Sequence, residues 1–343
     1  MTNSKLFGLL HGVAFITFSL AASWFTLAQS SSSTPSNPRP KLSFPVKCVV
    51  GQSCLVQKLV DHDPTSERRD YRCGKLTTDG HDGVDIRLRT LDDMRIGFPV
   101  VAAAGGTVLR TRDGELDISV RERNVLTAKQ AGNGVVIDHG NGWQTQYSHL
   151  KQGSISVKPG QRIDAGDPLG LIGLSGNTEF PHLHFSVRHR DATIDPFTGD
   201  RQGGNCTTTA TERGLWDTEA SRALRYSPTA IISVGLSSNM PSKLAMTQTQ
   251  GAQPPKPTAP MFLWADVLGV NPGDVQTFII SGPDGRVIHS QKVIVKDGGL
   301  SWFAYSGKRA PDTTWPSGQY AGTYHLSRQD VHIGEASANA LLE

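Results

Sequence analysis

Two histidines near residue 183 have the spacing of a catalytic or metal-binding pair. The stretch 181–187 reads Pro-His-Leu-His-Phe-Ser-Val, so His182 and His184 alternate with apolar side chains. This period of two predicts a β-strand with both imidazoles on its polar face. Their Cα atoms would lie about 7 Å apart, which suits one metal ligand and one proton-transfer group beside the same water. The simpler alternative is a pair of exposed histidines on a strand.

A second group of ligand-type residues lies at 80–85, in Gly-His-Asp-Gly-Val-Asp. On an extended strand His81 and Asp85 would be about 13 Å apart, whereas metal donors converge to about 2.0–2.2 Å from the ion. The backbone must therefore bend between them, and Gly83 permits a bend. The pattern H-x-x-x-D has little specificity by itself. We expect Asp82 to point away from the metal if Asp85 points toward it.

A third histidine, His149, lies near the end of Thr-Gln-Tyr-Ser-His-Leu at 145–150. The strand period predicts that Thr145, Tyr147 and His149 share one face. A lone strand histidine is more often structural, so His149 gains a functional interpretation only together with the other two groups.

Taken in order, these motifs resemble the lysostaphin/LytM-type zinc metallopeptidases of family M23, which cut peptide bonds in bacterial cell walls. The resemblance runs from Gly80 to Phe185 and is highly specific. Its segments are Gly-His-Asp-Gly-Val-Asp at 80–85, Pro-Val-Val-Ala-Ala at 99–103, Gly-Asn-Gly at 132–134, His-Gly-Asn-Gly at 139–142, Tyr-Ser-His-Leu at 147–150, Val-Lys-Pro-Gly at 157–160 and Ser-Gly-Asn-Thr-Glu-Phe-Pro-His-Leu-His-Phe at 175–185.

The resemblance implies that His81, Asp85 and His184 bind zinc and that His149 and His182 are the catalytic pair beside the metal. All five positions are filled, unlike in family members that have lost ligands and act as non-enzymatic activators. Two neutral imidazoles and one carboxylate leave a net positive centre with an open fourth position, as in catalytic zinc sites. A bound water would have its pKa lowered toward ~7; one histidine would take its proton and the other would stabilise the oxyanion. We expect activity to fall on the acid side within about pH 5–8, where histidine titrates.

The other basic and histidine residues receive structural interpretations. His139 opens a hairpin turn and is expected to be structural. Arg188 and Arg190 alternate on the strand after His184 and are expected to form a solvated edge. The remaining histidines beyond the first thirty residues are expected on the surface: His62, His189, His289, His325 and His332.

Short strands with glycine-bearing turns are expected to position the site. Glycine is 36 of 343 residues, above the average usage of about 7%. The resemblance to family M23 implies that residues 45–206 form a mostly β, glycine-rich antiparallel sheet of the LytM-like hybrid-barrel type. Asn141-Gly142 is a strong hairpin signal, and 113–130 is interpreted as an insertion or flap. Strands are expected at Val100–Ala104, Gly106–Arg110, Gly134–Asp138, Gln144–His149, Ser154–Val157 and Leu169–Ile172.

The C-terminal residues 228–343 are predicted to form a smaller immunoglobulin-like β-sandwich after a linker, 207–227, that contains a short helix near 216–224. A Gln- and Pro-rich tract at 248–258 is interpreted as a loop. The three tryptophans in the sandwich are expected in its core: Trp264, Trp302 and Trp315. Strands are expected at Ile231–Leu236, Pro260–Leu268, Asp274–Ile280, Val287–Val295, Leu300–Tyr305 and Gly322–Arg328.

The N-terminal residues 1–28 resemble an export signal, with Lys5 before an uncharged run, and a retained membrane anchor is the alternative. Residues 29–44 are interpreted as an unpacked Ser/Pro-rich linker. Both alternatives place the remainder outside the cytoplasm, in the periplasm or secreted. Four cysteines in an exported chain favour two disulfides, with three pairings open, over a thiolate zinc site. The four are Cys48, Cys54, Cys73 and Cys206.

Charge and composition exclude several classes of function. Lys+Arg 34 against Asp+Glu 31 is too balanced for a nucleic-acid-binding protein. The likeness of 157–170 to a lipoyl or biotinyl hairpin fails because no lysine stands at the exposed turn. With these classes excluded, the resemblance to family M23 implies a zinc metalloendopeptidase acting on peptidoglycan peptide stems. The alternatives are a non-catalytic activator of cell-wall amidases and an exported protease for glycine-rich proteins or competitor walls. The partner of the C-terminal domain is not predicted.

Overall fold

The computed structural model describes residues 39–343 except 123, 205, 207–213 and 244–253. The expected export segment and residues 29–38 of the expected linker lie outside the described residues. Within the part that is described, no helix has the length and hydropathy needed to cross a membrane. Residues 39–343 form one compact unit.

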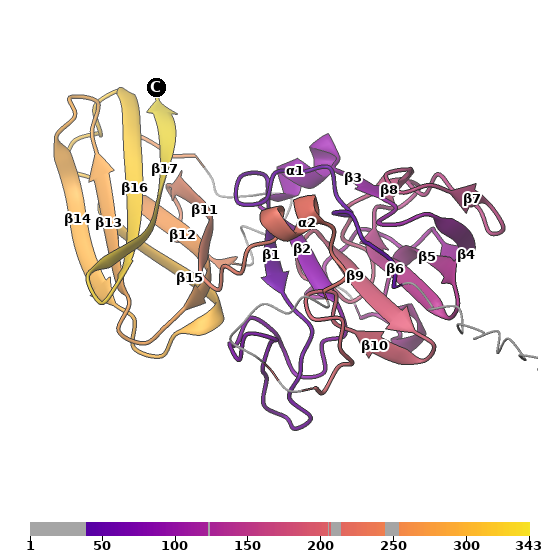
Figure 1. Ribbon diagram of the computed structural model, residues 1–343. Helices are drawn as coiled ribbons and strands as arrows, with labels where there is room; N and C mark the ends of the chain where they lie inside the picture. Colours follow the sequence, from indigo (N-terminus) through magenta and orange to yellow (C-terminus); the bar gives the residue numbers. More distant parts are fainter. Residues whose placement is uncertain (1–38, 123, 205, 207–213, 244–253) are drawn as a thin grey trace, which may run out of the picture. The chain divides into compact units, whose positions relative to one another are not determined.

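An eight-stranded sheet dominates the part of the chain before residue 206 (Figure 1), and every ladder in it is antiparallel. Its order is β1-β2-β9-β6-β5-β4-β7, with β10 paired to β9. A separate two-stranded sheet pairs β3 with β8. The strands are β1 (Cys54–Lys58), β2 (Val84–Leu88), β3 (Pro99–Val101), β4 (Gly106–Arg112), β5 (Asn133–Gly140), β6 (Trp143–Leu150), β7 (Arg162–Ile163), β8 (Pro168–Leu171), β9 (His182–His189) and β10 (Ala192–Ile194).

Strand β9 lies between β2 and β6, and this position decides where the motif residues meet. In the register, Asp85 of β2 and Ser148 of β6 both stand opposite His184. Residues directly opposite one another in a ladder share a face. The apolar residues that alternate with the histidines of β9, among them Leu183 and Phe185, are fully buried in the core. The predicted alternation of this strand is confirmed.

The predicted strands of this part are mostly confirmed, with two corrections. Residues 154–157 form no strand; the hydroxyl of Ser154 instead donates to Lys151 O, which closes a turn. Strands β1, β2, β7 and β10 were also not predicted; β7 and β10 are only two and three residues long, too short to show a period. The expected hairpin at Asn141-Gly142 is confirmed, with both residues at positive φ (54° and 83°).

The described helices are short. Helix α1 (Leu91–Ile96) begins with a capping box between Thr90 and Asp93, and helix α2 (Thr218–Ala223) is capped by Asp217. A single 3-10 turn, η1 (Thr127–Lys129), interrupts the expected flap. The predicted helix near 216–224 is thus confirmed, whereas α1 was not predicted.

The expected unpacked linker is wrong at its C-terminal end. Leu42 is fully buried, its N–H donates to Leu215 O at 2.9 Å, and its carbonyl accepts from Asp217 N at 2.9 Å. Leu42 and Phe44 are apolar, and burying them against the core is favourable. The packed part of the chain therefore includes residues before 45.

The C-terminal part contains two antiparallel sheets around a core of their own (Figure 1). One sheet has the order β11-β12-β15 and the other β14-β13-β16-β17. The sheets face each other, since a Cβ at Gly322 of β16 would lie 2.7 Å from Leu263 Cδ1 of β12. The strands are β11 (Ala230–Ser237), β12 (Met261–Val270), β13 (Val275–Ser281), β14 (Val287–Ile294), β15 (Gly299–Lys308), β16 (Gly318–Arg328) and β17 (Val331–Leu342).

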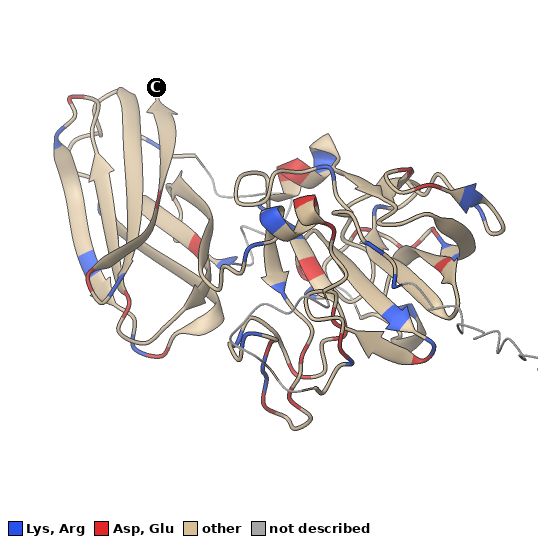
Figure 2. Ribbon diagram, viewed as in Figure 1, with Lys and Arg blue, Asp and Glu red and all other residues tan. Residues whose placement is uncertain are grey.

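This arrangement is mostly β and antiparallel, as predicted, and the immunoglobulin-like assignment stays a prediction. Strand β17 was not predicted, because the residues at its half-buried positions, Gly334, Ala336, Ala338 and Ala340, are small and make the alternation a weak signal. Trp264 and Trp315 are buried as expected, and Trp302 is half-buried against the same core. Most of the tract 248–258 lies outside the described residues. Charges of both signs occur along both parts of the ribbon (Figure 2).

Two disulfides join Cys48 to Cys54 and Cys73 to Cys206. Two disulfides were predicted, and the structure selects one of the three pairings. The second bridge connects residues 133 positions apart and closes a loop that contains the whole site.

Candidate active site

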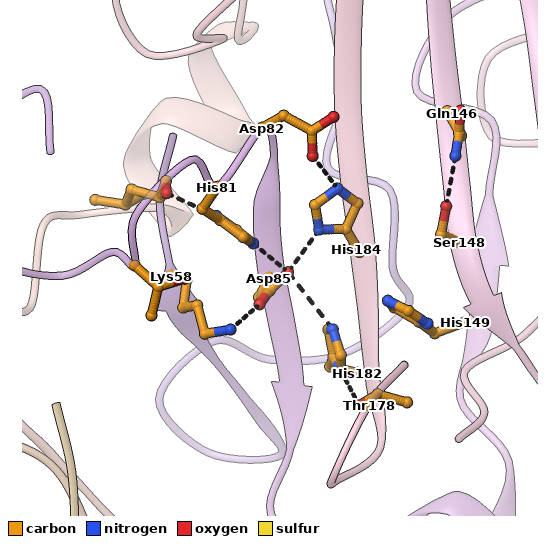
Figure 3. A network of polar contacts seen from close by, with 12 residues as sticks. Lys58, His81, Asp82, Asp85, Gln146, Ser148, His149, Thr178, His182 and His184 are labelled. Carbon is orange, nitrogen blue, oxygen red and sulfur yellow. Dashed lines mark hydrogen bonds and ion pairs between the residues drawn. The ribbon is translucent and has the colours of Figure 1, made fainter. Parts of the chain in front are cut away.

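Three side chains converge: His81 from the loop before β2, Asp85 of β2 and His184 of the neighbouring strand β9 (Figure 3). His81 Nε2 lies 3.0 Å from Asp85 Oδ1, and His184 Nδ1 lies 2.9 Å from the same oxygen. One ligand atom from each of the three residues lies within 4.8 Å of the others. The structure therefore brings together the three residues for which the sequence predicted metal binding.

The partners of the outer ring nitrogens test whether this set fits a metal ion. His81 Nδ1 lies 2.8 Å from Leu59 O, which can only accept, and His184 Nε2 lies 3.1 Å from Asp82 Oδ1. Each neutral ring must therefore carry its proton on the outer nitrogen and direct a lone pair toward Asp85. Three electron-pair donors facing one point repel one another unless a cation or extra protons lie between them. Two imidazoles and one carboxylate fit a zinc ion with an open position.

Gly83 enables this convergence by providing space. It lies in a bend, as expected, but its φ is not positive, so conformational freedom is not its main contribution. A Cβ at this position would lie 2.7 Å from His184 Nε2 and 2.7 Å from Phe185 O. Only glycine lets the 81–85 segment approach β9 this closely.

Two further imidazoles lie beside the triad, with ring centroids 4.6 Å apart. His149 Nδ1 lies 2.7 Å from Ser175 O, and His182 Nδ1 lies 3.0 Å from Phe180 O. Because a carbonyl only accepts, both rings carry their proton on Nδ1 and keep a lone pair on Nε2. His182 Nε2 lies 3.5 Å from Asp85 Oδ1, next to the triad. Both rings are thus oriented as proton acceptors.

The position of His149 corrects the prediction that Thr145, Tyr147 and His149 share a face. Tyr147 is fully buried in the core, and its hydroxyl accepts from Ala103 N at 2.7 Å. The β5–β6 ladder pairs Asn133 with Leu150 and then Gly134 with Ser148, so His149 is an extra residue in a β-bulge. Its φ of 63° is rare for a non-glycine residue. Bulges re-aim side chains near active sites, and this one directs His149 toward His182.

Burial and neighbouring charges separate the protonation states of the histidines. Burial lowers the pKa of His182 to about 4, against the opposing effect of Asp85. Burial, reinforced by His182 and His184, lowers the pKa of His149 well below its usual range. Burial alone would lower the pKa of His184 as well, but Asp82 and Asp85 raise it to about 9. The expected acid-side loss of activity therefore moves below the usual histidine range.

Asp82, Arg188 and Gln146 form a polar network outside the triad that sequence reasoning missed. Asp82 does point away from Asp85, as expected, but it contacts the outer nitrogen of His184, and this hydrogen bond lowers the pKa of Asp82 to about 2. Arg188 is half-buried, donates to Gln146 Oε1 at 2.7 Å and lies 3.7 Å from Asp82 Oδ2, so it is not a solvated edge. On the other side of the triad, Lys58 Nζ lies 3.4 Å from Asp85 Oδ2.

The histidines outside the site divide into structural and surface residues. His139 bridges Gly105 O and Thr145 Oγ1, each at 2.8 Å, as expected for a structural residue. The prediction that His62 is a surface residue is wrong: it is 1% exposed and pairs with Asp195 at 2.8 Å. Asp195 lies 133 positions away, so no local pattern could have indicated the contact.

The five predicted site residues line one cleft of about 930 Å³. Its size falls in the usual range for ligand sites, about 300–1,000 Å³. Lys58, Arg68, Asp79 and Glu179 contribute charges of both signs to its walls, and Gly299–Ser301 of the C-terminal part also lines it.

Comparison with known proteins identifies the family that this part of the chain matches. Residues 79–196 match the family model described as peptidase family M23. The segment is an M23 peptidase domain. It contains all five predicted site residues, from His81 to His184.

Two curated relatives illustrate the similarity. The peptidoglycan DD-endopeptidase ShyA of Vibrio cholerae is 36% identical over 115 residues, which cover 34% of this chain and 22% of ShyA. The DD-carboxypeptidase/endopeptidase Mpg of Neisseria meningitidis is 29% identical over 103 residues, or 30% of this chain and 22% of Mpg. The chain thus spans less than a quarter of the length of either relative.

A solved zinc-containing peptidase from Vibrio cholerae is 26% identical and covers 47% of this chain and 41% of its own, with a TM-score of 0.32. The M23 assignment rests on the family match and the curated relatives.

Proposed function

We propose that this protein is an exported zinc metalloendopeptidase that hydrolyses peptide cross-links of bacterial peptidoglycan. His81, Asp85 and His184 would hold the zinc ion, and His149 and His182 would move the protons. The observation that carries the proposal is the convergence of three lone-pair donors beside two neutral imidazoles, inside an M23 domain.

Zinc held by this triad would supply an activated water and a polarised substrate carbonyl. Neighbouring residues hold the ligand atoms of His81, Asp85 and His184 in position. Leu59 O and Asp82 hold the outer nitrogens of the two histidine ligands, and Lys58 engages the second oxygen of Asp85. Such outer partners set ring orientation and ligand basicity.

The hydrogen bonds of His149 and His182 dictate the order of proton transfers. Both Nδ1 protons are already donated to backbone carbonyls, so neither ring can donate from Nε2 at the start. One Nε2 first accepts a proton from the attacking water. The protonated ring then becomes a donor, able to stabilise the oxyanion and to protonate the leaving amine. The lowered pKa values of both rings keep them ready to accept at neutral pH.

The substrate class comes from the relatives. ShyA and Mpg are described by names that include peptidoglycan DD-endopeptidase and DD-carboxypeptidase/endopeptidase activities. By similarity we assign peptidoglycan peptide stems as the substrate. Two disulfides favour an oxidising compartment, so the periplasm or the exterior is the proposed location.

Digestion of purified sacculi, followed by mass spectrometry of the released muropeptides, tests the proposal. We expect cross-linked dimers to decrease and monomers to increase, with loss of activity in chelator and in His81→Ala. His139→Ala is the matched control, because it removes an imidazole outside the triad and should retain activity.

The amidase-activator alternative has a different outcome in the same assay. Without an amidase, the zinc-loaded, folded protein would leave the sacculi intact. When an amidase is added, the protein would increase their digestion. That result would overturn the proposed function.

A further inference from the structure

We propose that Arg87 is a positioning residue for His182 and that Asp266, in the C-terminal part of the chain, holds Arg87 in place. The inference rests on the proposed function and deepens it, because it makes the C-terminal part a component of the catalytic site.

Arg87 lies two residues after Asp85 on β2 and stands directly opposite His182 in the β2–β9 ladder. Its side chain is only 3% exposed. The guanidinium carbon lies 4.2 Å from the centroid of the Phe180 ring, a distance at which a cation and an aromatic face attract. Arg87 is thus packed against the segment that leads into the catalytic histidine.

Phe180 connects this contact to the orientation of His182. Its carbonyl oxygen lies 3.0 Å from His182 Nδ1, and Thr178 Oγ1 lies 3.0 Å from the same nitrogen. Thr178 Oγ1 also donates to Phe180 O at 2.8 Å. The position of the Phe180 backbone therefore decides whether His182 keeps its proton on Nδ1 and its lone pair on Nε2.

The charge of Arg87 is balanced from the C-terminal part. Arg87 Nη2 lies 2.9 Å from Asp266 Oδ2 of β12, and Asp266 is itself only 6% exposed. Among the described residues, Arg87 Nε and Nη1 have no hydrogen-bond partner. A buried guanidinium with a single carboxylate partner depends on that partner to stay in place.

Other contacts also join the C-terminal part to the chain next to β2. Arg89 donates to the carbonyls of Ile231 and Ile232 at 2.9 and 2.6 Å. Ile232 and Leu268 are buried in the same hydrophobic cluster as the core of the N-terminal sheet. Strands β11 and β12 are thus packed on the chain around β2, and the Arg87–Asp266 pair lies within this contact.

The test compares Asp266→Asn with a matched control in the zinc-loaded full chain. Asp274→Asn is the control, because Asp274 is also buried and paired with an arginine, Arg328 at 2.7 Å, but within the C-terminal part. We expect Asp266→Asn to lower kcat roughly 10- to 100-fold at nearly constant KM and unchanged zinc content, the size expected for a misplaced catalytic group. Asp274→Asn should lower thermal stability but leave kcat near wild type.

A second readout does not depend on activity. The ¹⁵N chemical shifts of the His182 ring report its tautomer, and we expect the Nδ1-protonated form to be lost in Asp266→Asn. Arg87→Lys keeps a charge beside Asp266 but lacks the flat guanidinium that covers Phe180. This variant should fold, bind zinc and lose the same tautomer preference.

An unchanged His182 tautomer in both variants, or equal losses of kcat in Asp266→Asn and Asp274→Asn, would overturn the inference. If the wild type leaves sacculi uncut, the proposed function fails, whereas the tautomer comparison still decides the role of Arg87.

Discussion

At the scale of single residues, the site is defined by which nitrogen of each histidine is already engaged. Leu59 O, Asp82, Ser175 O and Phe180 O each occupy one ring nitrogen. The other ring nitrogens of His81, His184 and His182 lie 3.0, 2.9 and 3.5 Å from Asp85 Oδ1. Three of these four acceptors are backbone carbonyls, which mutation cannot remove. Asp82 is the exception, and it offers a direct test of how the ligands are held.

We predict that Asp82→Asn weakens zinc binding roughly 10- to 100-fold, the range found for outer partners of metal ligands. The amide removes the charge that favours a proton on His184 Nε2 and thereby a lone pair on Nδ1. Competition against a chelator of known affinity measures the change. Asp79→Asn is the control, since Asp79 also lines the cleft but is exposed, whereas the carboxylates that contact His184 are Asp82 and Asp85. Equal affinity in the two variants would contradict the role of Asp82.

We predict that zinc binding releases a proton at neutral pH. In the metal-free fold the pKa of His184 is raised from 6.5 to about 9, so this ring is protonated at pH 7 and must lose its proton to bind. Apparent zinc affinity should therefore rise with pH and level off above about 9. The same shift stabilises the metal-free fold fully below pH 6.5, and this contribution is lost as pH rises through 9.

Calorimetry in buffers of different ionisation enthalpy measures the protons released. A zinc affinity that is constant between pH 6.5 and 9 would contradict the raised pKa of His184.

At the scale of elements, the sequence predicted what is periodic or ordered along the chain and missed what depends on pairing. The alternation in β9 and the order of the motifs indicated all five site residues. The bulge that turns His149 toward the cleft was not predicted, because it depends on the register between β5 and β6. The burial of His62 and the Arg87–Asp266 pair are contacts across 133 and 179 positions, and no local pattern records them.

We predict that Gly83→Ala abolishes tight zinc binding. Its Cβ would have to displace His184 or the β9 backbone, both 2.7 Å away. Zinc content after dialysis is the measurement. Gly153→Ala is the control: this glycine has a φ of 72° with no atom near its Cβ position, so it should lose only about 1–2 kcal/mol of stability to backbone strain. Full zinc occupancy in Gly83→Ala would show that the approach to β9 is not required.

At the scale of the whole molecule, two features hold the site together: the long disulfide and the contacts of the C-terminal part with β2. The Cys73–Cys206 bridge spans 133 positions and the Cys48–Cys54 bridge only 6. A cross-link that closes a longer loop removes more entropy from the unfolded chain.

We predict that Cys73→Ala/Cys206→Ala lowers the free energy of unfolding by about 4–5 kcal/mol and Cys48→Ala/Cys54→Ala by about 2 kcal/mol, from the loop lengths. Denaturant unfolding of the two double variants measures the difference. A larger loss from the short bridge would show that native-state contacts, rather than loop entropy, govern the effect.

We propose that one zinc ion, held by His81, Asp85 and His184, makes this chain a peptidoglycan endopeptidase. The most direct measurement is to strip the protein with chelator, titrate zinc back and follow the conversion of cross-linked muropeptide dimers to monomers. We expect cleavage to rise in proportion to added zinc, to saturate at about one ion per chain as a single catalytic site requires, and to stay absent in His184→Ala. Cleavage at full rate by the stripped protein, or zinc saturation without any cleavage, would contradict it.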